Sequence, residues 1–376
     1  MRIAVVRQTY NPAGGAERFV SNALRQLALE ENFQIEILAR RWQPIKGVAF
    51  NKVDPFYLGS YMRDKTFAHE VMKEFAKGSY DITQSHERIP GCQIYRAGDG
   101  LHFRWLQLRQ QAGDSILSSL MPYHRYTLSA ERKMYEDSRL RFVICNSRMV
   151  ENELHEIYPE VGGKTVLIYN AVDSKKFSPS LKYEYRNSVR DRLSIDERDK
   201  VLVFVGSGFK RKGVKKVLSA LSALPKDVKA IFVGSDKHIN RYKSFAKSIG
   251  VDERVRFVGQ GNPLPFYGSA DGFILPSLYD PLPNACMEAF ASGLPVLTSS
   301  QCGASELITH GENGYSFDFF DDKAIKDSML NWYEDLNEGK SLAEAARETI
   351  LPFTYEYQTQ KLLEIYKQII NRDESK

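Results

Sequence analysis

Apolar residues follow two alternating spacings along this chain. Short β-branched runs such as Arg2–Val6 and Val201–Val205 predict buried strands, because a strand covered on both faces is apolar throughout. Longer segments with helical spacing follow them, including Ala16–Leu29 and Val214–Leu221. Further strands are predicted at 33–38, 80–85, 91–97, 140–145, 230–233, 255–258, 272–275 and 296–298, and a further helix at 284–292. This alternation predicts parallel sheets with helices on both faces.

The alternating pattern occurs twice, which indicates two doubly wound α/β domains within the 376 residues. A polar, proline-bearing stretch at 171–180 (AVDSKKFSPS) marks the expected joint, so that the domains would be 1–172 and 173–354. The segment Tyr355–Asn371 has helical apolar spacing and predicts a C-terminal helix. Ligands of open α/β sheets bind beyond the carboxyl ends of the strands, so we expect the active site in a cleft between two facing sheets.

Composition excludes several classes of protein. A hydrophobic content of 43% with 12% aromatic residues excludes a disordered chain, and no apolar run approaches the ~18 residues of a membrane span. The N-terminus becomes polar too early for a signal peptide. The four cysteines have no CxxC spacing, so neither a zinc site nor a disulfide framework is predicted. We therefore expect a soluble cytoplasmic protein.

The net charge of +5 is unevenly distributed. Residues 1–172 hold 23 Lys and Arg against 19 Asp and Glu, which gives +4 and leaves +1 for the rest of the chain. The excess in the first half favours an acidic partner there. Acidic residues nearly balance basic ones and no recognised nucleic-acid-binding module is present, so a nucleic-acid partner is not expected.

A first candidate motif, Asn11-Pro12-Ala13-Gly14-Gly15-Ala16-Glu17-Arg18, lies between the first strand and the first helix. The paired Gly14 and Gly15 allow backbone amides to approach a ligand closely, and a helix N-terminus favours an anion. The motif is not GxGxxG, so NAD binding is unsupported. A simple tight turn between strand and helix is the alternative.

A second motif is Gly206-Ser207-Gly208-Phe209-Lys210-Arg211-Lys212-Gly213, again between a buried strand and a helix. Small residues leave space there, and three consecutive cations stand where a phosphate would dock. A P-loop would read GxxxxGK[ST], which this segment does not. The alternative is an ordinary solvated loop that carries three cations.

A third motif carries two acids eight residues apart, Asp280 on a loop and Glu288 on the following helix. Carboxylates accept hydrogen bonds from sugar hydroxyls, and amides at the helix start can donate to the same ligand. The intervening Pro281, Leu282, Pro283, Asn284 and Ala285 are therefore candidate ligand contacts. A solvated loop acid with a helix-surface glutamate is the alternative.

A fourth candidate lies in the first domain, where His86 and Asp99 each follow a predicted strand. Asp99 stands between two glycines, which suits an exposed carboxylate on an irregular turn. An aspartate that only forms the turn is the alternative.

Taken together, these segments resemble family 4 of the retaining glycosyltransferases, which have the GT-B fold. The resemblance is carried by Gly14-Gly15-Ala16-Glu17-Arg18, by Tyr169-Asn170-Ala171-Val172-Asp173, by Arg211-Lys212-Gly213, and by Asp280…Glu288-Ala-Phe-Ala-Ser-Gly-Leu-Pro-Val-Leu. Residues 10–15 and 205–214 are most similar to the lipopolysaccharide-core glucosyltransferases, which extend an inner-core heptose from UDP-glucose.

The resemblance implies two Rossmann-like domains facing a central cleft: 1–172 for the acceptor and 173–354 for the nucleotide-sugar donor. A helix at about 355–376 would cross back to the first domain. By resemblance Arg211 and Lys212 hold the diphosphate, Glu288 the ribose, and Asp280 with the amides of Leu282–Ala285 the donor sugar. Gly14 and Gly15 would cap the diphosphate, and Gly206 and Ser207 would complete the donor site. Asp99 would act in catalysis, and His86 is the second candidate residue on the acceptor side. No cofactor or metal is implied, and transfer would proceed by front-face attack.

The first acid departs from the family pattern, which has Glu where this chain has Asp280. One methylene less shortens its reach by about 1.5 Å, the length of a C–C bond. Pro283 stands where the family often has Gly, which removes an amide donor. The resemblance favours glucose as the donor sugar, whereas these departures make galactose or an N-acetylhexosamine, transferred to another surface polysaccharide, the alternative. Other GT-B enzymes, such as a sugar-nucleotide epimerase or a phosphorylase, are the remaining enzymatic alternatives.

The segment 102–133 mixes basic, aromatic and aliphatic residues with a net charge of +3. This composition suits an interfacial segment on anionic lipid, although an ordinary helical excursion has the same pattern. The resemblance favours the membrane, because a lipid-anchored acceptor requires the enzyme at the membrane surface. We therefore expect a peripheral protein on the inner face of the bacterial inner membrane.

Overall fold

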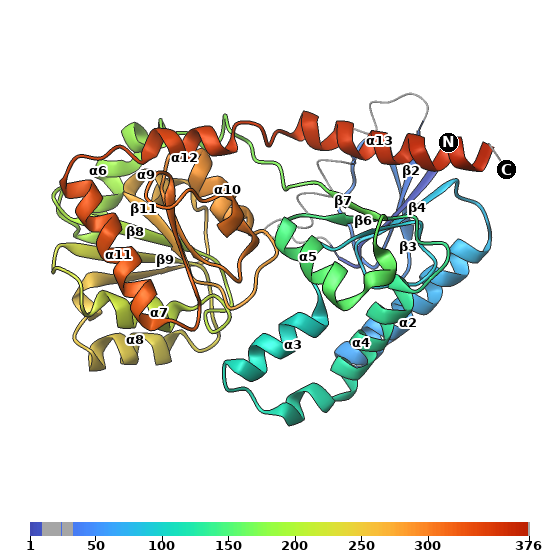
Figure 1. Cartoon of the computed structure of the whole chain (residues 1–376), viewed down its shortest axis with the longest axis horizontal. Helices are drawn as coiled ribbons and strands as arrows, with labels where there is room; N and C mark the ends of the chain where they lie inside the picture. Colours follow the sequence, from blue (N-terminus) through green and yellow to red (C-terminus); the bar gives the residue numbers. More distant parts are fainter. Residues whose placement is uncertain (10–23, 25–32, 375–376) are drawn as a thin grey trace. The chain divides into compact units, whose positions relative to one another are not determined.

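The computed structural model describes residues 1–9, 24 and 33–374 (Figure 1). The chain divides into two compact units, Met1–Ala171 together with Tyr355–Lys376, and Val172–Thr354. Most of the predicted helix at 16–29, with Gly14 and Gly15, lies outside the described residues.

Unit 1 contains a seven-stranded parallel sheet in the order β3-β2-β1-β4-β5-β6-β7. The strands are β1 Arg2–Val6, β2 Gln34–Ala39, β3 Val48–Lys52, β4 Ile82–Ser85, β5 Ile94–Arg96, β6 Phe142–Cys145 and β7 Thr165–Leu167. Its helices are α2 Gly59–Ala76, α3 His102–Gln111, η1 Ile116–Leu120, α4 Pro122–Tyr135, α5 Arg148–Ile157, η2 Pro159–Val161 and α13 Tyr355–Glu374.

Helices cover both faces of this sheet, and accordingly its central strands β1 and β4 are buried along almost their whole length. Alternate residues of β1 point to opposite faces. Ala4 and Val6 pack in a cluster that includes residues of α2, α4 and α5. Ile3 and Val5 belong to the other cluster, to which α13 contributes Leu362, Ile365, Tyr366 and Ile369. The C-terminal helix therefore packs on the sheet of the first unit (Figure 1).

Unit 2 contains a six-stranded parallel sheet in the order β10-β9-β8-β11-β12-β13. The strands are β8 Lys200–Val205, β9 Val228–Val233, β10 Val255–Gly259, β11 Gly272–Leu275, β12 Val296–Ser299 and β13 Gly314–Phe317. The helices are α6 Leu181–Leu193, α7 Val214–Leu221, α8 Ile239–Ser248, η3 Asp252–Arg254, α9 Leu264–Ser269, α10 Asn284–Ala291, η4 Gly303–Leu307, α11 Asp322–Asn337 and α12 Ala343–Ile350.

Both sheets have a switch point, where strand order changes direction. In unit 1 this is β1, between β2 and β4, and in unit 2 it is β8, between β9 and β11. Ligands of open α/β sheets bind beyond the carboxyl ends of strands at such points. The loops after β1 and β4, and after β8 and β11, are therefore where functional side chains are expected.

Candidate active site

In unit 2, the cation-bearing turn after β8 packs closely against the loop after β11. The amide of Leu278 donates to the carbonyl of Arg211 at 2.8 Å. Gly213, with φ of 76°, begins the approach to α7, and a Cβ there would overlap the Pro276 carbonyl oxygen. Glycine is required because a side chain at this position would push the two loops apart. The contact brings the second and third motifs, 68 residues apart, into one site.

Asp280 lies against both cations of this turn. Its Oδ2 accepts from Arg211 Nη1 at 3.1 Å and from Lys212 Nζ. Lys212 and Asp280 are both 8% exposed. Burial acts to raise the pKa of Asp280, but the nearby Lys212 and Arg211 outweigh it and lower that pKa below its usual value. Asp280 is therefore an ionised carboxylate shared by two cations.

Glu288 belongs to the same site through α10 and is 4% exposed. The Tyr267 hydroxyl, from α9, donates to Glu288 Oε2 at 3.0 Å and contacts the Ala285 carbonyl at 3.3 Å. Tyr267 therefore fixes both the acid and the first turn of α10. Pro281, Leu282 and Pro283 are buried, and Asn284 and Ala285 are intermediate and begin the helix.

The carboxyl ends of β8, β9 and β10 each supply a polar side chain. Ser207 Oγ accepts from the Ser235 amide at 3.2 Å, and Ser235 Oγ lies 3.4 Å from Gln260 Oε1. The aliphatic part of Lys212 passes Gly206, where a Cβ would lie 3.5 Å from Lys212 Cε. Gly206 and Ser207 therefore share this strand edge with the cations.

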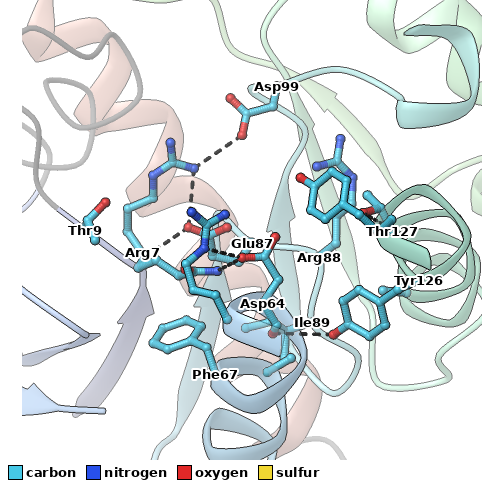
Figure 2. A pocket seen from close by; sticks show the side chains of 15 residues that line it. Arg7, Thr9, Asp64, Phe67, Glu87, Arg88, Ile89, Asp99, Tyr126 and Thr127 are labelled. Carbon is cyan, nitrogen blue, oxygen red and sulfur yellow. Dashed lines mark hydrogen bonds and ion pairs between the residues drawn. The ribbon is translucent and has the colours of Figure 1, made fainter. Parts of the chain in front are cut away.

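Unit 1 has a cavity of about 270 Å³ beyond the ends of β1 and β4 (Figure 2). Arg7, one of the residues that line it, donates from Nη1 to Asp99 Oδ2 at 3.3 Å and lies 3.6 Å from Glu87 Oε1. Gln8 donates its amide to Glu87 at 3.0 Å and its side-chain Nε2 to Asp64 Oδ1 at 3.1 Å. The wall includes three arginines, three acids and two tyrosines: Arg7, Arg63, Arg88, Asp64, Glu87, Asp99, Tyr123 and Tyr126.

The acids on this wall titrate differently. The side chain of Asp99 is 51% exposed, so desolvation opposes its ionisation only weakly, and Arg7 and Arg88 lower its pKa below the usual value. Burial raises the pKa of Glu87, although Arg7 and the Gln8 amide oppose the shift. Asp99 therefore remains ionised at a pH where Glu87 begins to bind a proton.

His86 is buried and is not among the residues that line the cavity. The Tyr366 hydroxyl donates to Gln84 Oε1 at 2.7 Å, so the Gln84 amide nitrogen is the donor to His86 Nε2 at 2.9 Å. The accepting imidazole is then neutral, and burial lowers the pKa of His86 well below its usual value. Its neighbour Glu87, which was not singled out from the sequence, lines the cavity instead.

The segment 102–133 folds as a helical hairpin of α3, η1 and α4 in unit 1. Ile116, Leu117, Leu120 and Met121 are 55–73% exposed at its tip. Arg104 is engaged by Glu153 and Glu156, and Arg109 by Asp114. No helix among the described residues is both long and apolar enough to cross a membrane.

Comparison with known proteins identifies the class to which this fold and these motifs belong. The model "Glycosyltransferase Family 4" matches residues 13–176, and "Glycosyl transferases group 1" matches residues 186–349. The chain belongs to the family 4 glycosyltransferases and has the GT-B fold.

Among its relatives, an uncharacterized glycosyltransferase of Methanocaldococcus jannaschii, MJ1607, is 29% identical across 46% of this chain and 45% of its own length. The lipopolysaccharide glucosyltransferase WaaG of Escherichia coli is 23% identical across 84% of each chain. The fold matches a crystal structure of WaaG with a TM-score of 0.81, at 20% identity over 97% of this chain and 99% of that chain. It matches Anabaena HepE, in complex with UDP-glucose, with a TM-score of 0.73, at 19% identity over 98% and 100%.

Proposed function

We propose that the protein transfers a hexose, with glucose favoured, from a UDP-sugar to a sugar of a lipid-linked glycan. The lipopolysaccharide core is the acceptor that the resemblance to WaaG favours. One observation carries the donor side: Arg211 and Lys212 stand after the central strand of unit 2, against the loop that leads to Glu288. The complex of HepE with UDP-glucose supports a UDP-linked donor.

In this proposal, Arg211 and Lys212 bind the diphosphate and offset the negative charge that develops on the leaving group. Two fixed cations in a partly buried site supply the electrostatic stabilisation that a metal ion provides in other transferases, so no metal or cofactor is required. Glu288, held by Tyr267, accepts from the ribose hydroxyls. Asp280 and the amides of Leu282, Asn284 and Ala285 contact the donor sugar, whereas Pro283 has no N–H to offer.

The cavity of unit 1 is the proposed place of the acceptor sugar. Its volume of about 270 Å³ is near the lower end of known ligand pockets, which begin at about 300 Å³, and suits one sugar ring. Asp64 and Glu87 can accept from hydroxyl groups, while the rings of Tyr123 and Tyr126 can pack on the apolar face of a pyranose. Asp99, kept ionised by its arginine neighbours, orients the reacting hydroxyl.

Transfer would retain configuration by front-face attack. The acceptor hydroxyl approaches the anomeric carbon from the side of the departing phosphate, and that phosphate oxygen takes the hydroxyl proton as the glycosidic bond forms. The protein then positions the reactants and stabilises the developing charge, since neither Asp280 nor Glu288 has to form a covalent bond to the sugar.

We further propose peripheral attachment to an anionic membrane through 102–133, on the cytoplasmic face of the inner membrane. The exposed apolar tip of this hairpin supports the proposal, as does the exposed Arg125 on α4. Phe56 and Leu58, which are 75% and 71% exposed just before α2, form a second apolar edge in the same unit. Large exposed apolar groups of this kind commonly mark interaction surfaces.

A donor panel tests the proposed function. Deacylated lipopolysaccharide core is incubated separately with UDP-glucose, UDP-galactose and UDP-N-acetylhexosamines, with a GDP-sugar as control. The product masses are measured by mass spectrometry. We expect a product one hexose heavier with UDP-glucose. A galactose or N-acetylhexosamine product would identify a different donor sugar, which the shorter side chain of Asp280 would then accommodate. Inactivity with every donor would reject the proposal. Conversion of the sugar nucleotide without acceptor would indicate an epimerase.

A further inference from the structure

Asp280 binds the same two cations, Arg211 and Lys212, that the proposed function assigns to the donor diphosphate. A single oxygen, Oδ2, accepts from both Arg211 Nη1 and Lys212 Nζ. The backbone of Asp280 is also fixed, because its amide donates to Gln301 at 3.1 Å and its carbonyl accepts from Gly303 at 2.9 Å. The loop cannot easily carry the acid away, so a change of partner requires rotation of the side chain.

The attraction between Asp280 and the two cations is strengthened by burial. Lys212 and Asp280 are each 8% exposed, so water screens their attraction poorly. Any anion that binds Arg211 and Lys212 must compete with the Asp280 carboxylate for their N–H donors. If the Asp280 carboxylate stays beside the two cations, it also repels the bound anion, because the two charges have the same sign.

UDP and a UDP-sugar differ in what they offer Asp280 in return. UDP brings further negative charge to the cations, and the proposed function assigns its ribose hydroxyls to Glu288, so that UDP offers the displaced carboxylate no donor in place of the cations. A UDP-sugar brings the same two phosphates together with sugar hydroxyls, which donate hydrogen bonds to a carboxylate. A displaced Asp280 therefore gains a new partner only when the sugar is attached.

We propose that Asp280 is a competing anion that makes the site favour the UDP-sugar over UDP. This inference rests on the proposed function and adds a step to it. When the sugar has been transferred, the carboxylate loses its hydroxyl partners, returns to Arg211 and Lys212, and promotes the release of UDP. Asp280 is then a specificity-determining residue whose contribution to UDP binding is negative, although it lies in contact with both diphosphate-binding cations.

Isothermal titration calorimetry with UDP, and with the UDP-sugar that supports transfer in the panel, tests this inference. In Asp280→Asn the competing charge is lost, so we expect UDP to bind about tenfold more tightly, which corresponds to about 1.4 kcal/mol. The affinity for the UDP-sugar should rise less, because the contact with the sugar hydroxyls is weakened at the same time. Asp280→Glu retains the charge and should restore the preference for the UDP-sugar.

Glu288→Gln is the matched control, since this acid on the same loop-and-helix unit binds the Tyr267 hydroxyl and should not gain affinity for UDP when neutralised. Asp280→Ser is a second charge-free variant, and thermal unfolding of each variant identifies any that fails to fold. Unchanged or weaker UDP binding in folded Asp280→Asn and Asp280→Ser would overturn the inference and leave the proposed function intact. A wild-type protein that binds neither UDP nor a UDP-sugar would instead reject the proposed function.

Discussion

At the scale of single residues, the two acids beside Arg7 give the unit 1 cavity a pH dependence. The pKa of Glu87 is raised and that of Asp99 is lowered. As the pH falls, Glu87 therefore loses its charge before Asp99. A protonated Glu87 accepts less strongly from an acceptor hydroxyl, so the contact is present above the raised pKa and lost as the pH falls through it.

We accordingly expect the KM for the acceptor to rise as the pH falls through the raised pKa of Glu87, while the KM for the donor changes little. Glu87→Gln, which cannot titrate, should have a raised acceptor KM that no longer depends on this ionisation. Steady-state kinetics of the wild-type protein and of Glu87→Gln, measured from neutral pH downward, check the expectation. An identical pH profile in Glu87→Gln would contradict it.

Lys212→Ala tests the charge at the diphosphate. In the proposed mechanism Lys212 offsets the charge of the leaving group, so removal of this buried donor should lower kcat by about 100-fold or more. Asp280 retains Arg211 at 3.1 Å, so the protein should still fold, which thermal unfolding can verify. Lys210→Ala, on the same turn, is the control and should lower kcat less. Near-normal turnover in Lys212→Ala would remove this residue from the proposed mechanism.

The sequence indicates some of these residues better than others, for a physical reason. Arg211 and Lys212 can be proposed because they directly follow a buried strand and precede a helix. Asp64 and Tyr126 lie on α2 and α4, inside helical patterns that resemble ordinary packing, and they meet across the cavity only in the folded chain. The neutral His86 and the wall residue Glu87 are adjacent in sequence, so which of them reaches the cavity depends on the conformation after β4.

At the scale of elements, Glu131 on α4 connects three parts of unit 1. It is fully buried and accepts from the amides of His102 and Phe103, at 2.8 and 3.4 Å, which begin α3. It also accepts from Arg88 Nε at 2.8 Å and from the Tyr158 hydroxyl at 3.2 Å. Leu101, the residue before α3, provides no side-chain cap, so Glu131 supplies that cap from another helix.

Glu131→Ala should therefore lower the free energy of unfolding by about 3 kcal/mol or more, because it leaves the Arg88 cation and two helix amides without their partner. Glu136→Ala is the matched control: Glu136 pairs with the 72% exposed side chain of Arg132, and its loss should cost less than about 1 kcal/mol. Urea denaturation of both variants gives the comparison. Equal losses would show that the contacts of Glu131 contribute no more to stability than an exposed ion pair does.

Element prediction succeeds where burial is two-sided and weakens at the sheet edges. The central strands β1, β8 and β11 coincide with the apolar runs, because both of their faces are covered. β3 (VAFNK) is an edge strand with intermediate and exposed residues throughout, and its apolar run of Val48–Phe50 is too short to indicate a buried strand. β7 has three residues, and so short a strand is defined by pairing with β6 rather than by its own pattern.

At the scale of the whole molecule, exposed large apolar side chains gather in unit 1, before α2 and at the tip of the α3–η1–α4 hairpin. The segment 102–133 has a net charge of +3, but Arg104 and Arg109 are paired with acids of the same unit. Arg104 and Arg109 are therefore compensated within the unit, whereas Arg125 on α4 is exposed. Burial of apolar groups in the lipid interface should contribute more to membrane binding than those two arginines.

The double variant Leu117→Ser/Leu120→Ser should weaken binding to vesicles of phosphatidylglycerol and phosphatidylcholine by about 30-fold or more, because each lost apolar side chain removes about 1–2 kcal/mol of interfacial burial. Neutralising Arg104, Arg109 and Arg125 together should have a smaller effect that disappears at high salt. Tyr183→Ser is the control, since this unit 2 residue is 93% exposed and lies outside both apolar segments. Co-sedimentation at several lipid concentrations measures the binding constants. Wild-type binding that neither unit 1 variant reduces would exclude this hairpin as the membrane contact, and the Phe56 and Leu58 edge would then be the next surface to test.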